Sequence, residues 1–459
     1  MRPRRGGSIR SSDDGSVMGL ERRDRVIEPL SAANPNGEER SVSAKPFDIP
    51  KRLVWSAWRT VRVNRGAAGV DEESLETFER DLRNNLYRLW NRMSSGSYFP
   101  PPVREVMIPK KSGGQRPLGI PTISDRVAQT VVKLVLEPEL EPHFHEDSYG
   151  YRPGRSAHQA IAITRKRCWW NDWVLEFDIR GLFDNIDQAL LLKAVRHHTS
   201  CKWVLLYIER WLSAPVQQTD GKLRQRTKGT PQGGVISPLL ANLFLHYAFD
   251  RWMARKFPRL PFCRYADDGL VHCRTLKQAE YVKERLAPRL MECGLELHPD
   301  KTRIVYCKDL HRRQEYDFIR FDFLGYTFRP RRSFDRYGRL FTNFTPAISA
   351  SASKAIRQEV RSWRLQLKSD KSLEDLSRMF GPVINGWMRY YCRFYESAFN
   401  PTARHINRCI VRWAMRKFRK LRGHKVRAIK WVQRIATTAA LVCTLASGLP
   451  VCGSMMGAG

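Results

Sequence analysis

The sequence is poor in acidic side chains: it has 46 Asp and Glu against 80 Lys and Arg, which gives a formal net charge of +34 over 459 residues. An excess of one sign repels itself in a compact fold, so a bound polyanion is expected to balance it. Nucleic acid is the first candidate, because each phosphate that a basic side chain neutralises releases counterions and adds affinity. A purely structural basic protein is the weaker interpretation.

Zinc-ligand and disulfide patterns are also missing. The ten cysteines are scattered and contain no Cys-x-x-Cys pair, which argues against a zinc site or a disulfide framework. His143, His145, His197 and His198 have no Cys or acidic partner at ligand spacing, so we interpret them as surface or core histidines. Free cysteines suit a reducing cytosol, and the charged N-terminus lacks the apolar stretch of a secretory signal.

The two ends of the chain lack the pattern of a folded core. Residues 1–45 are rich in Gly, Ser, Arg and Glu without an apolar period, which predicts a disordered leader. Residues 435–459 carry no charge, but they are rich in Thr, Ser and Gly and contain Pro450. We therefore expect a frayed tail there rather than a membrane helix, and no membrane partner.

Apolar periodicity divides the remaining chain. Residues 46–100 have helical spacing, 101–345 alternate short strands with helices, and 346–434 are helical only. This order predicts an α+β core followed by an all-helical domain. Residues 408–434 hold eleven basic residues and no acidic one, interleaved with aromatics, which indicates a nucleic-acid-binding helical module. Its candidate contacts are Arg412, Arg416, Lys417, Arg419, Lys420 and Arg422.

Three carboxylates carry the chemistry. Asp267 and Asp268 form a pair inside Tyr-Ala-Asp-Asp at 265–268, between two short apolar segments. Adjacent carboxylates repel each other, and a divalent cation would supply the missing positive charge. Asp178 ends the apolar strand expected at 173–177, so it could face Asp267 across one sheet and share two Mg²⁺ ions with it. Asp184 and Asp187 are interpreted as capping or surface groups.

Seven blocks resemble, in the same order, those of reverse transcriptases. They are Ile-Pro-Lys-Lys-Ser-Gly-Gly-Gln-Arg-Pro-Leu-Gly-Ile-Pro at 108–121, Ser-Tyr-Gly-Tyr-Arg-Pro-Gly-Arg at 148–155, Phe-Asp-Ile-Arg-Gly-Leu-Phe at 177–183, Gly-Thr-Pro-Gln-Gly-Gly-Val-Ile-Ser-Pro at 229–238, Tyr-Ala-Asp-Asp at 265–268, Leu-His-Pro-Asp-Lys-Thr at 297–302 and Phe-Leu-Gly-Tyr at 323–326. One block alone is weak, but seven in order leave little room for coincidence.

The specific resemblance is to bacterial group II intron-encoded proteins, which combine a reverse transcriptase and a maturase. Gly-Ala-Ala-Gly-Val-Asp at 66–71 resembles their N-terminal extension, and Asn-Gly-Trp-Met-Arg-Tyr-Tyr at 385–391 resembles their thumb or maturase domain. The resemblance covers about 46–434 and implies a right-hand polymerase. Its parts would be a leader (1–45), an N-terminal helical extension (46–100), fingers and palm (101–345), a thumb/maturase domain (346–434) and an uncharged tail (435–459).

The resemblance assigns roles by position. Asp178, Asp267 and the backbone carbonyl of Ile179 would hold two Mg²⁺ ions, with Asp268 completing the anionic site. The implied nucleotide-binding roles are a triphosphate clamp for Lys110, Lys111 and Arg116, exclusion of a 2′-hydroxyl for Phe183, nucleotide contacts for Gln232 and Gly233, and general acid to pyrophosphate for Lys301.

The implied function is RNA-directed DNA synthesis on intron RNA, with help in intron splicing and mobility, in the bacterial cytoplasm. The implied partners are intron RNA, the template–primer RNA/DNA duplex, target DNA and dNTPs. No C-terminal Cys/His cluster of an endonuclease is present, so we expect the enzyme to borrow a primer. Nothing in the sequence indicates an oligomeric state.

Two alternatives compete with this interpretation. A non-catalytic RNA-binding splicing cofactor could lose a carboxylate, but all three are present here. A reverse transcriptase of retron, diversity-generating or phage-defence type is the other. Retron enzymes usually carry a Val-Thr-Gly motif in the thumb region, which is missing here, and diversity-generating enzymes usually replace the Pro-Gln-Gly-Gly…Ser-Pro pattern, which is intact.

Overall fold

The structure is a computed structural model that describes residues 45–109, 113–335 and 337–436. The expected leader, apart from Lys45, and the expected tail, apart from its first two residues, lie outside this range, as do Lys110 and Lys111. Within it, no helix combines the length and the apolar character needed to cross a membrane.

The N-terminal part is a layer of helices around the long helix α4 (Ile123–Leu140). It contains α1 (Lys51–Asn64), α2 (Leu75–Arg80) and α3 (Leu82–Ser94). Helix α1 buries Val54, Ala57, Trp58 and Val61, which recur at helical spacing and pack this face against α4. Helices α2 and α3 are separate, because the backbone at Asp81 between them leaves the helical region (φ −121°, ψ 40°).

A first sheet has the strand order β2-β1-β4-β5. Strands β1 (Val103–Pro109) and β2 (Gln115–Ile120) form an antiparallel hairpin, with Ile108 opposite Arg116. Strand β4 (Val216–Gln217) runs parallel to β1 and pairs with β5 (Leu223–Arg224). The hairpin therefore presents Arg116 near its tip, exposed to solvent.

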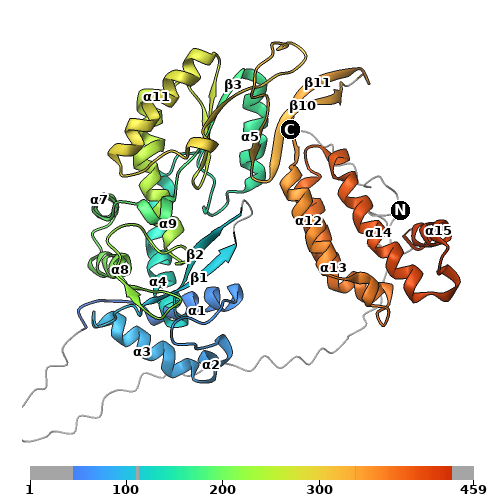
Figure 1. Cartoon of the computed structure of the whole chain (residues 1–459). Coiled ribbons are helices and arrows are strands. Elements are labelled where there is room, and N and C mark those ends of the chain that lie inside the picture. Colours follow the sequence, from blue (N-terminus) through green and yellow to red (C-terminus); the bar gives the residue numbers. More distant parts are fainter. Residues whose placement is uncertain (1–44, 110–112, 336, 437–459) are drawn as a thin grey trace, which may run out of the picture. The chain divides into compact units, whose positions relative to one another are not determined.

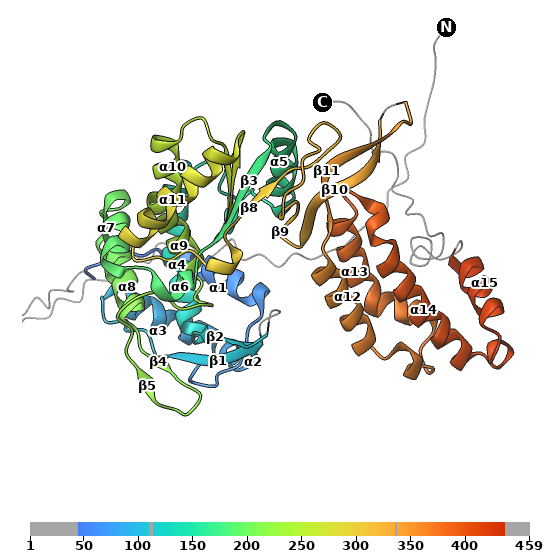
Figure 2. The ribbon, with the colours of Figure 1, turned by 45° about the horizontal axis from the view of Figure 1, so that its top comes forward.

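The second sheet is entirely antiparallel, in the order β6-β7-β3-β8. Its strands are β6 (Phe262–Tyr265), β7 (Asp268–Cys273), β3 (Trp173–Asp178) and β8 (Arg303–Tyr306). Consecutive residues of β3 are buried, because both faces of the sheet are covered. Helix α5 (Ala157–Trp170) contributes to the core on one face and α11 (Leu276–Glu292) to that on the other, as Figures 1 and 2 show.

The segments around the second sheet are helical. They are α6 (Leu182–Asn185), α7 (Gln188–His198), α8 (Lys202–Ser213), α9 (Ser237–Leu245), a π-helical segment (His246–Asp250), α10 (Arg251–Lys256) and the 3-10 turns Glu141–His143 and Pro299–Lys301. The C-cap of α7 at Thr199 separates it from α8, so residues 190–212 belong to two helices.

A third sheet joins the strands to the C-terminal helices. It has the order β11-β10-β9, with β9 (Phe321–Phe323), β10 (Tyr326–Phe334) and β11 (Leu340–Ile348). Helices α12 (Ala350–Ser362), α13 (Leu373–Tyr391), α14 (Asn400–Lys417) and α15 (Lys425–Ala436) follow, with the 3-10 turns Leu365–Leu367, Glu396–Phe399 and Arg419–Leu421 between them.

The C-terminal helices have their own apolar core, in which Trp413 and Ile406 are fully buried. They are tied to the strands through α13, where the Tyr390 hydroxyl donates to the Leu324 carbonyl oxygen at 2.9 Å and the Tyr390 carbonyl contacts His158 Nε2 at 2.9 Å. The predicted fold class is confirmed: a mixed α+β core is followed by helices only.

Candidate active site

Three carboxylates meet at one end of the second sheet. The antiparallel register of β3 and β7 places Asp178 directly opposite Asp268, and Asp267 lies in the turn immediately before β7. The three groups interact electrostatically. Burial raises the pKa of Asp267, and the charge of Asp178 raises it further. The structure thus brings together the three residues that the sequence singled out.

The backbone turn that carries Asp267 is held by contacts from two other segments of the chain. Ala266 has a left-handed backbone (φ 55°), which is uncommon for a residue with a Cβ. The fully buried Arg264 donates from Nη1 to the Ala266 carbonyl oxygen at 3.0 Å and pairs with Asp250. Gly150 packs against the same turn, and a Cβ there would lie 2.4 Å from the Ala266 nitrogen. These contacts hold the backbone immediately before Asp267 from two sides.

The electrostatic environment of the three carboxylates favours the binding of a cation. Desolvation by the surrounding protein raises the pKa of Asp268 to about 7, and the charges of Asp267 and Asp178 add to this, although the Asp268 side chain retains solvent access. Lys301 hydrogen-bonds Asp178, and this contact raises the Lys301 pKa. The lysine from the 297–302 block therefore lies at the carboxylates.

The carboxylates do not form a ready-made metal cage. In the described ranges, no group of three or more His, Cys, Asp or Glu side chains is arranged to hold a metal ion, and Lys301 engages Asp178. The donor set nevertheless fits a hard divalent cation, because burial and the neighbouring carboxylates raise the pKa values of Asp267 and Asp268 in spite of the nearby Lys301. The Ile179–Leu297 bridge is held through the carbonyls of Asp178 and Glu296, so its hydrogen bonds do not use the Ile179 carbonyl.

A glycine loop lies against the first hairpin. The Gly119 nitrogen donates to the Gln232 carbonyl oxygen at 2.6 Å, and a Cβ on Gly233 (φ 107°) would lie 2.4 Å from the Gly119 carbonyl oxygen. Only glycine allows this close approach. Gln232 Nε2 donates to Asp184 at 3.2 Å, so Asp184 is exposed, as predicted, and also anchors the loop. Asp187 caps α7, as predicted, by accepting from the Leu190 nitrogen at 2.8 Å.

Phe183 joins this loop to the short helix α6. Its side chain is partly buried against the main apolar core. Its carbonyl oxygen accepts from the Thr230 nitrogen at 2.7 Å. Phe183 thus follows the carboxylate strand by five residues and is bonded through its backbone to the loop that carries Gln232 and Gly233.

Sequence reasoning missed the residues that hold the loop from behind. The fully buried Gln129 accepts from the Val235 nitrogen at 2.7 Å and the Ile236 nitrogen at 3.3 Å, and it donates to Asp125 at 2.9 Å. Asp125 also accepts from Tyr98 at 2.8 Å and Trp211 at 2.7 Å. The sequence signal for them is weak: Asp125 and Gln129 are two polar residues at helical spacing in a helix that carries other polar side chains.

Tyr151 is a second residue that the sequence did not single out. Its backbone is left-handed (φ 56°) and its side chain is half exposed. Desolvation raises the Tyr151 pKa, the charge of Asp267 raises it further, and Arg116 lowers it. The tyrosine hydroxyl therefore lies within electrostatic range of both the hairpin arginine and the carboxylates. Lys110 and Lys111, the other predicted clamp residues, lie outside the described residues.

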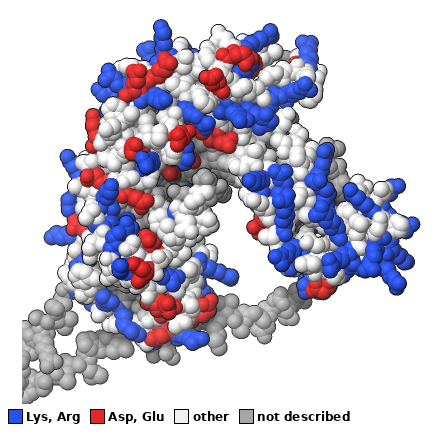
Figure 3. All heavy atoms as spheres, in the orientation of Figure 1, with Lys and Arg blue, Asp and Glu red and all other residues white. Residues whose placement is uncertain are grey.

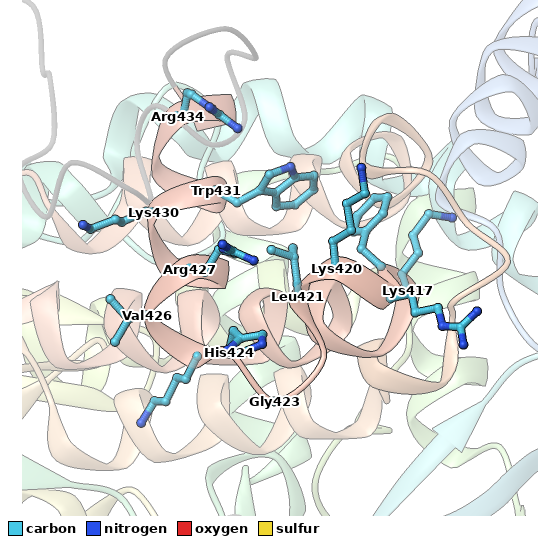
Figure 4. Close-up of a pocket in the computed structure, with 13 residues that line it drawn as sticks. Lys417, Lys420, Leu421, Gly423, His424, Val426, Arg427, Lys430, Trp431 and Arg434 are labelled. Carbon is cyan, nitrogen blue, oxygen red and sulfur yellow. The ribbon is translucent and has the colours of Figure 1, made fainter.

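Lys and Arg gather over the C-terminal helices (Figure 3). A hollow of about 1530 Å³ between the ends of α14 and α15 is lined by Lys417, Arg419 and Lys420 of the predicted contacts, with Trp431 beside them (Figure 4). No Asp or Glu is among its described lining residues. The other predicted contacts, Arg412, Arg416 and Arg422, are exposed outside this hollow.

Two known protein families match the two main parts of the chain. A family described as reverse transcriptase (RNA-dependent DNA polymerase) matches residues 108–328, and one described as group II intron, maturase-specific domain, matches residues 353–431. Protein YkfC of Escherichia coli (strain K12) is 31% identical over 340 residues, which cover 66% of this chain and 86% of YkfC.

Two further proteins are similar to the chain. The group II intron-encoded protein LtrA of Lactococcus lactis subsp. cremoris is 28% identical over 428 residues, covering 76% of this chain and 69% of LtrA. Telomerase from Candida albicans, solved with a fragment of telomeric RNA, aligns with a TM-score of 0.42 and 14% identity over 79% of this chain and 66% of that one. That likeness is too low to support an argument.

The two matched families account for both parts of the sequence interpretation. Reverse transcriptases use divalent metal ions, and reverse transcriptase and maturase domains act on RNA and other nucleic acid. The chain belongs to the group II intron-encoded reverse transcriptases, with an RNA-directed DNA polymerase region and a maturase domain in one polypeptide.

Proposed function

We propose that the chain copies intron RNA into DNA at Asp178, Asp267 and Asp268. The observation that carries this proposal is the β3–β7 register, which sets Asp178 opposite Asp268 with Asp267 in the adjoining turn. Such a cluster of carboxylates suits nucleotidyl transfer, in which positioning and charge stabilisation supply most of the rate enhancement.

Asp178 and Asp267, with the Ile179 carbonyl, are the proposed ligands of two Mg²⁺ ions, and Asp268 completes the anionic site. When bound, the ions would supply activation of a primer 3′-hydroxyl and stabilisation of the pyrophosphate charge. The rigid turn around Ala266 holds Asp267 ready, so little reorganisation is needed when substrate arrives. Lys301 is close enough to Asp178 to serve as the cation, and general acid, beside the leaving group.

The nucleotide is proposed to bind between the hairpin and the Gln232–Gly233 loop. Gly233, whose positive φ lets the loop pack against Gly119, would give the loop the shape that contacts the substrate. Arg116, together with Lys110 and Lys111, would clamp the triphosphate. Phe183 would pack under the sugar and exclude a 2′-hydroxyl, which makes dNTPs the proposed substrates.

The basic C-terminal helices are proposed to bind intron RNA and the template–primer duplex, with target DNA as a third partner. Their support is the run of unopposed positive charge that includes Arg412, Arg416, Lys417, Arg419, Lys420 and Arg422. The matched maturase domain and the similarity to LtrA, an intron-encoded protein, point to intron RNA as the partner whose splicing is assisted.

Primer extension on poly(rA)/oligo(dT) with dTTP and Mg²⁺ tests the proposal. The wild type should extend the primer, Asp267→Ala should not, and Asp370→Ala, which removes an exposed loop carboxylate, should extend like the wild type. RNA binding by Asp267→Ala should remain. A folded wild type that binds RNA tightly but never extends the primer would instead favour a splicing cofactor without polymerase activity.

A further inference from the structure

A second basic pocket lies where β10 meets the start of α12 and the 3-10 turn Glu396–Phe399. Its volume is about 740 Å³. Five arginines line it, and no Asp or Glu is among its described lining residues: Arg320, Arg329, Arg331, Arg332 and Arg357. Within the described part of the chain, none of these five arginines forms an ion pair with a carboxylate.

Arg331 is the most enclosed cation of this pocket. Its guanidinium donates to two backbone carbonyl oxygens, of Thr345 at 3.3 Å and Thr327 at 3.2 Å, and lies 5.4 Å from the centre of the Tyr395 ring. Burial lowers the Arg331 pKa to about 10, and the charge of Arg329 lowers it further. A guanidinium held between neutral groups and other cations lacks the counter-charge that a half-buried arginine normally has.

A buried hydroxyl on the same sheet face also lacks a partner. Thr345 lies directly opposite Arg329 in the β10–β11 ladder, so the two side chains point to one face. Thr345 is only 2% exposed, and its hydroxyl forms no hydrogen bond within the described structure. The N-terminus of α12, capped by Ser349, lines the pocket and contributes partial positive charge.

The pocket continues into neighbouring basic hollows. It shares Arg357 and Pro401 with a hollow of about 570 Å³ lined also by Arg404 and Arg408. That hollow in turn shares Lys425 with the one between α14 and α15. None of the described lining residues of the three is acidic.

We propose that the β10–α12 pocket is a binding site for backbone phosphates of a nucleic-acid strand that runs from β10 along the connected hollows to α15. Arg331 and Arg357 are its central contacts. Only the naming of nucleic acid as the ligand rests on the proposed function; the site itself rests on the unpaired arginines and on the continuity of the hollows.

The chemistry favours a strand over a small anion. A free phosphate could fill one pocket but would leave the other two without counter-charge, whereas a phosphodiester chain neutralises all three in turn. The pocket is a phosphate site rather than a base site, because its one aromatic lining residue, Tyr395, already covers Arg331. Phosphate contacts of this kind position a strand without reading its sequence.

The test measures binding of the full chain to a fluorescent 20-nucleotide single-stranded RNA, and to DNA of the same sequence, across a salt series. Arg331→Gln, Arg357→Gln and the double variant each remove charge at similar side-chain length. Arg285→Gln, on the exposed side of α11 and outside the pocket, is the matched control. The Arg357 side chain donates no hydrogen bond to the described residues, so its variant remains informative if Arg331→Gln lowers the melting temperature.

Each lost contact should reduce the slope of log affinity against log salt by about 0.7, so the double variant should lose about 1.4. A loss with RNA and DNA alike identifies a shared phosphodiester site, and a loss with RNA alone identifies RNA as the strand. A slope that stays unchanged in the double variant with both RNA and DNA would overturn the site. Binding is measured without synthesis, so the two proposals can fail separately. If the wild type synthesises DNA and the variants keep its slope, only the pocket proposal is overturned. If the wild type synthesises no DNA and the variants have a smaller slope, only the polymerase proposal is overturned.

Discussion

Arg264 and Asp250 form a fully buried ion pair, with nitrogen–oxygen distances of 2.8 and 2.6 Å. Arg264 lies three residues before the catalytic candidate Asp267. The same guanidinium donates to the carbonyl oxygen of Ala266 and to the Ser148 hydroxyl. The pair therefore links the π-helical segment, the 148–155 block and the carboxylate turn. Its position, more than its net energy, explains why a charge pair is kept in the core.

Asp250→Ala should cost about 3–5 kcal/mol of stability, because it leaves the Arg264 charge buried without a partner. The loosened turn should also lower DNA synthesis by more than the loss of folded protein explains. Thermal unfolding and primer extension at 20 °C below the variant's own melting temperature would separate the two effects. Glu209→Ala, which breaks the exposed pair with Arg196, should cost at most about 1 kcal/mol.

Gly150→Ala should impair synthesis although it adds a single methyl group. The new Cβ would meet only backbone atoms of the catalytic turn, 2.4 Å from the Ala266 nitrogen and 3.1 Å from the Tyr265 carbonyl carbon. We expect a loss of kcat of at least about tenfold, since small displacements of reacting groups are costly. Gly386→Ala, with open space around it in α13, should leave kcat unchanged. Wild-type kcat in the Gly150 variant would show that the turn tolerates movement.

Gln129→Leu should weaken nucleotide binding from outside the nucleotide site. It removes the acceptor of the Val235 and Ile236 nitrogens, and an unsatisfied buried donor costs about 1–3 kcal/mol. Because the loop that contains Gln232 would lose its support, KM for dNTP should rise about tenfold with a smaller change in kcat. Steady-state kinetics on one template would measure this split. Gln366→Leu, at an exposed position, should change neither constant.

The sequence predicts the carboxylates because local pattern is sufficient for them: Asp178 ends an apolar strand and Asp267 lies in a turn between two others. Gln129 escapes such reasoning, since the loop nitrogens that donate to it lie more than one hundred residues further along the chain and only the packing of α4 brings them together. The basic run at 408–434 is likewise visible in the sequence, whereas Arg331 and Arg357 come from a strand and a helix whose apposition is a tertiary property.

His272 on β7 predicts an acid-sensitive core. Its side chain is fully buried, neither ring nitrogen has a hydrogen-bond partner in the described structure, and burial lowers its pKa to about 3. In the unfolded chain a histidine has a pKa of about 6.5. Between these values the unfolded state binds a proton that the folded state does not, so the free energy of unfolding falls as pH falls from about 6.5 to about 3.

His272→Leu should remove this contribution. Relative to the variant, the wild type should lose about 1.4 kcal/mol of stability for each pH unit below 6.5, measured by unfolding at a series of pH values between 7.5 and 4.5. His246→Leu should act in the same direction, because burial lowers the His246 pKa to about 4. Carboxylates with raised pKa values, such as Asp125 at about 6, work in the opposite direction in all three proteins, so the difference between wild type and variant isolates each histidine. Parallel curves for the wild type and His272→Leu would mean that the imidazole is protonated in the folded core, with an acceptor supplied on folding.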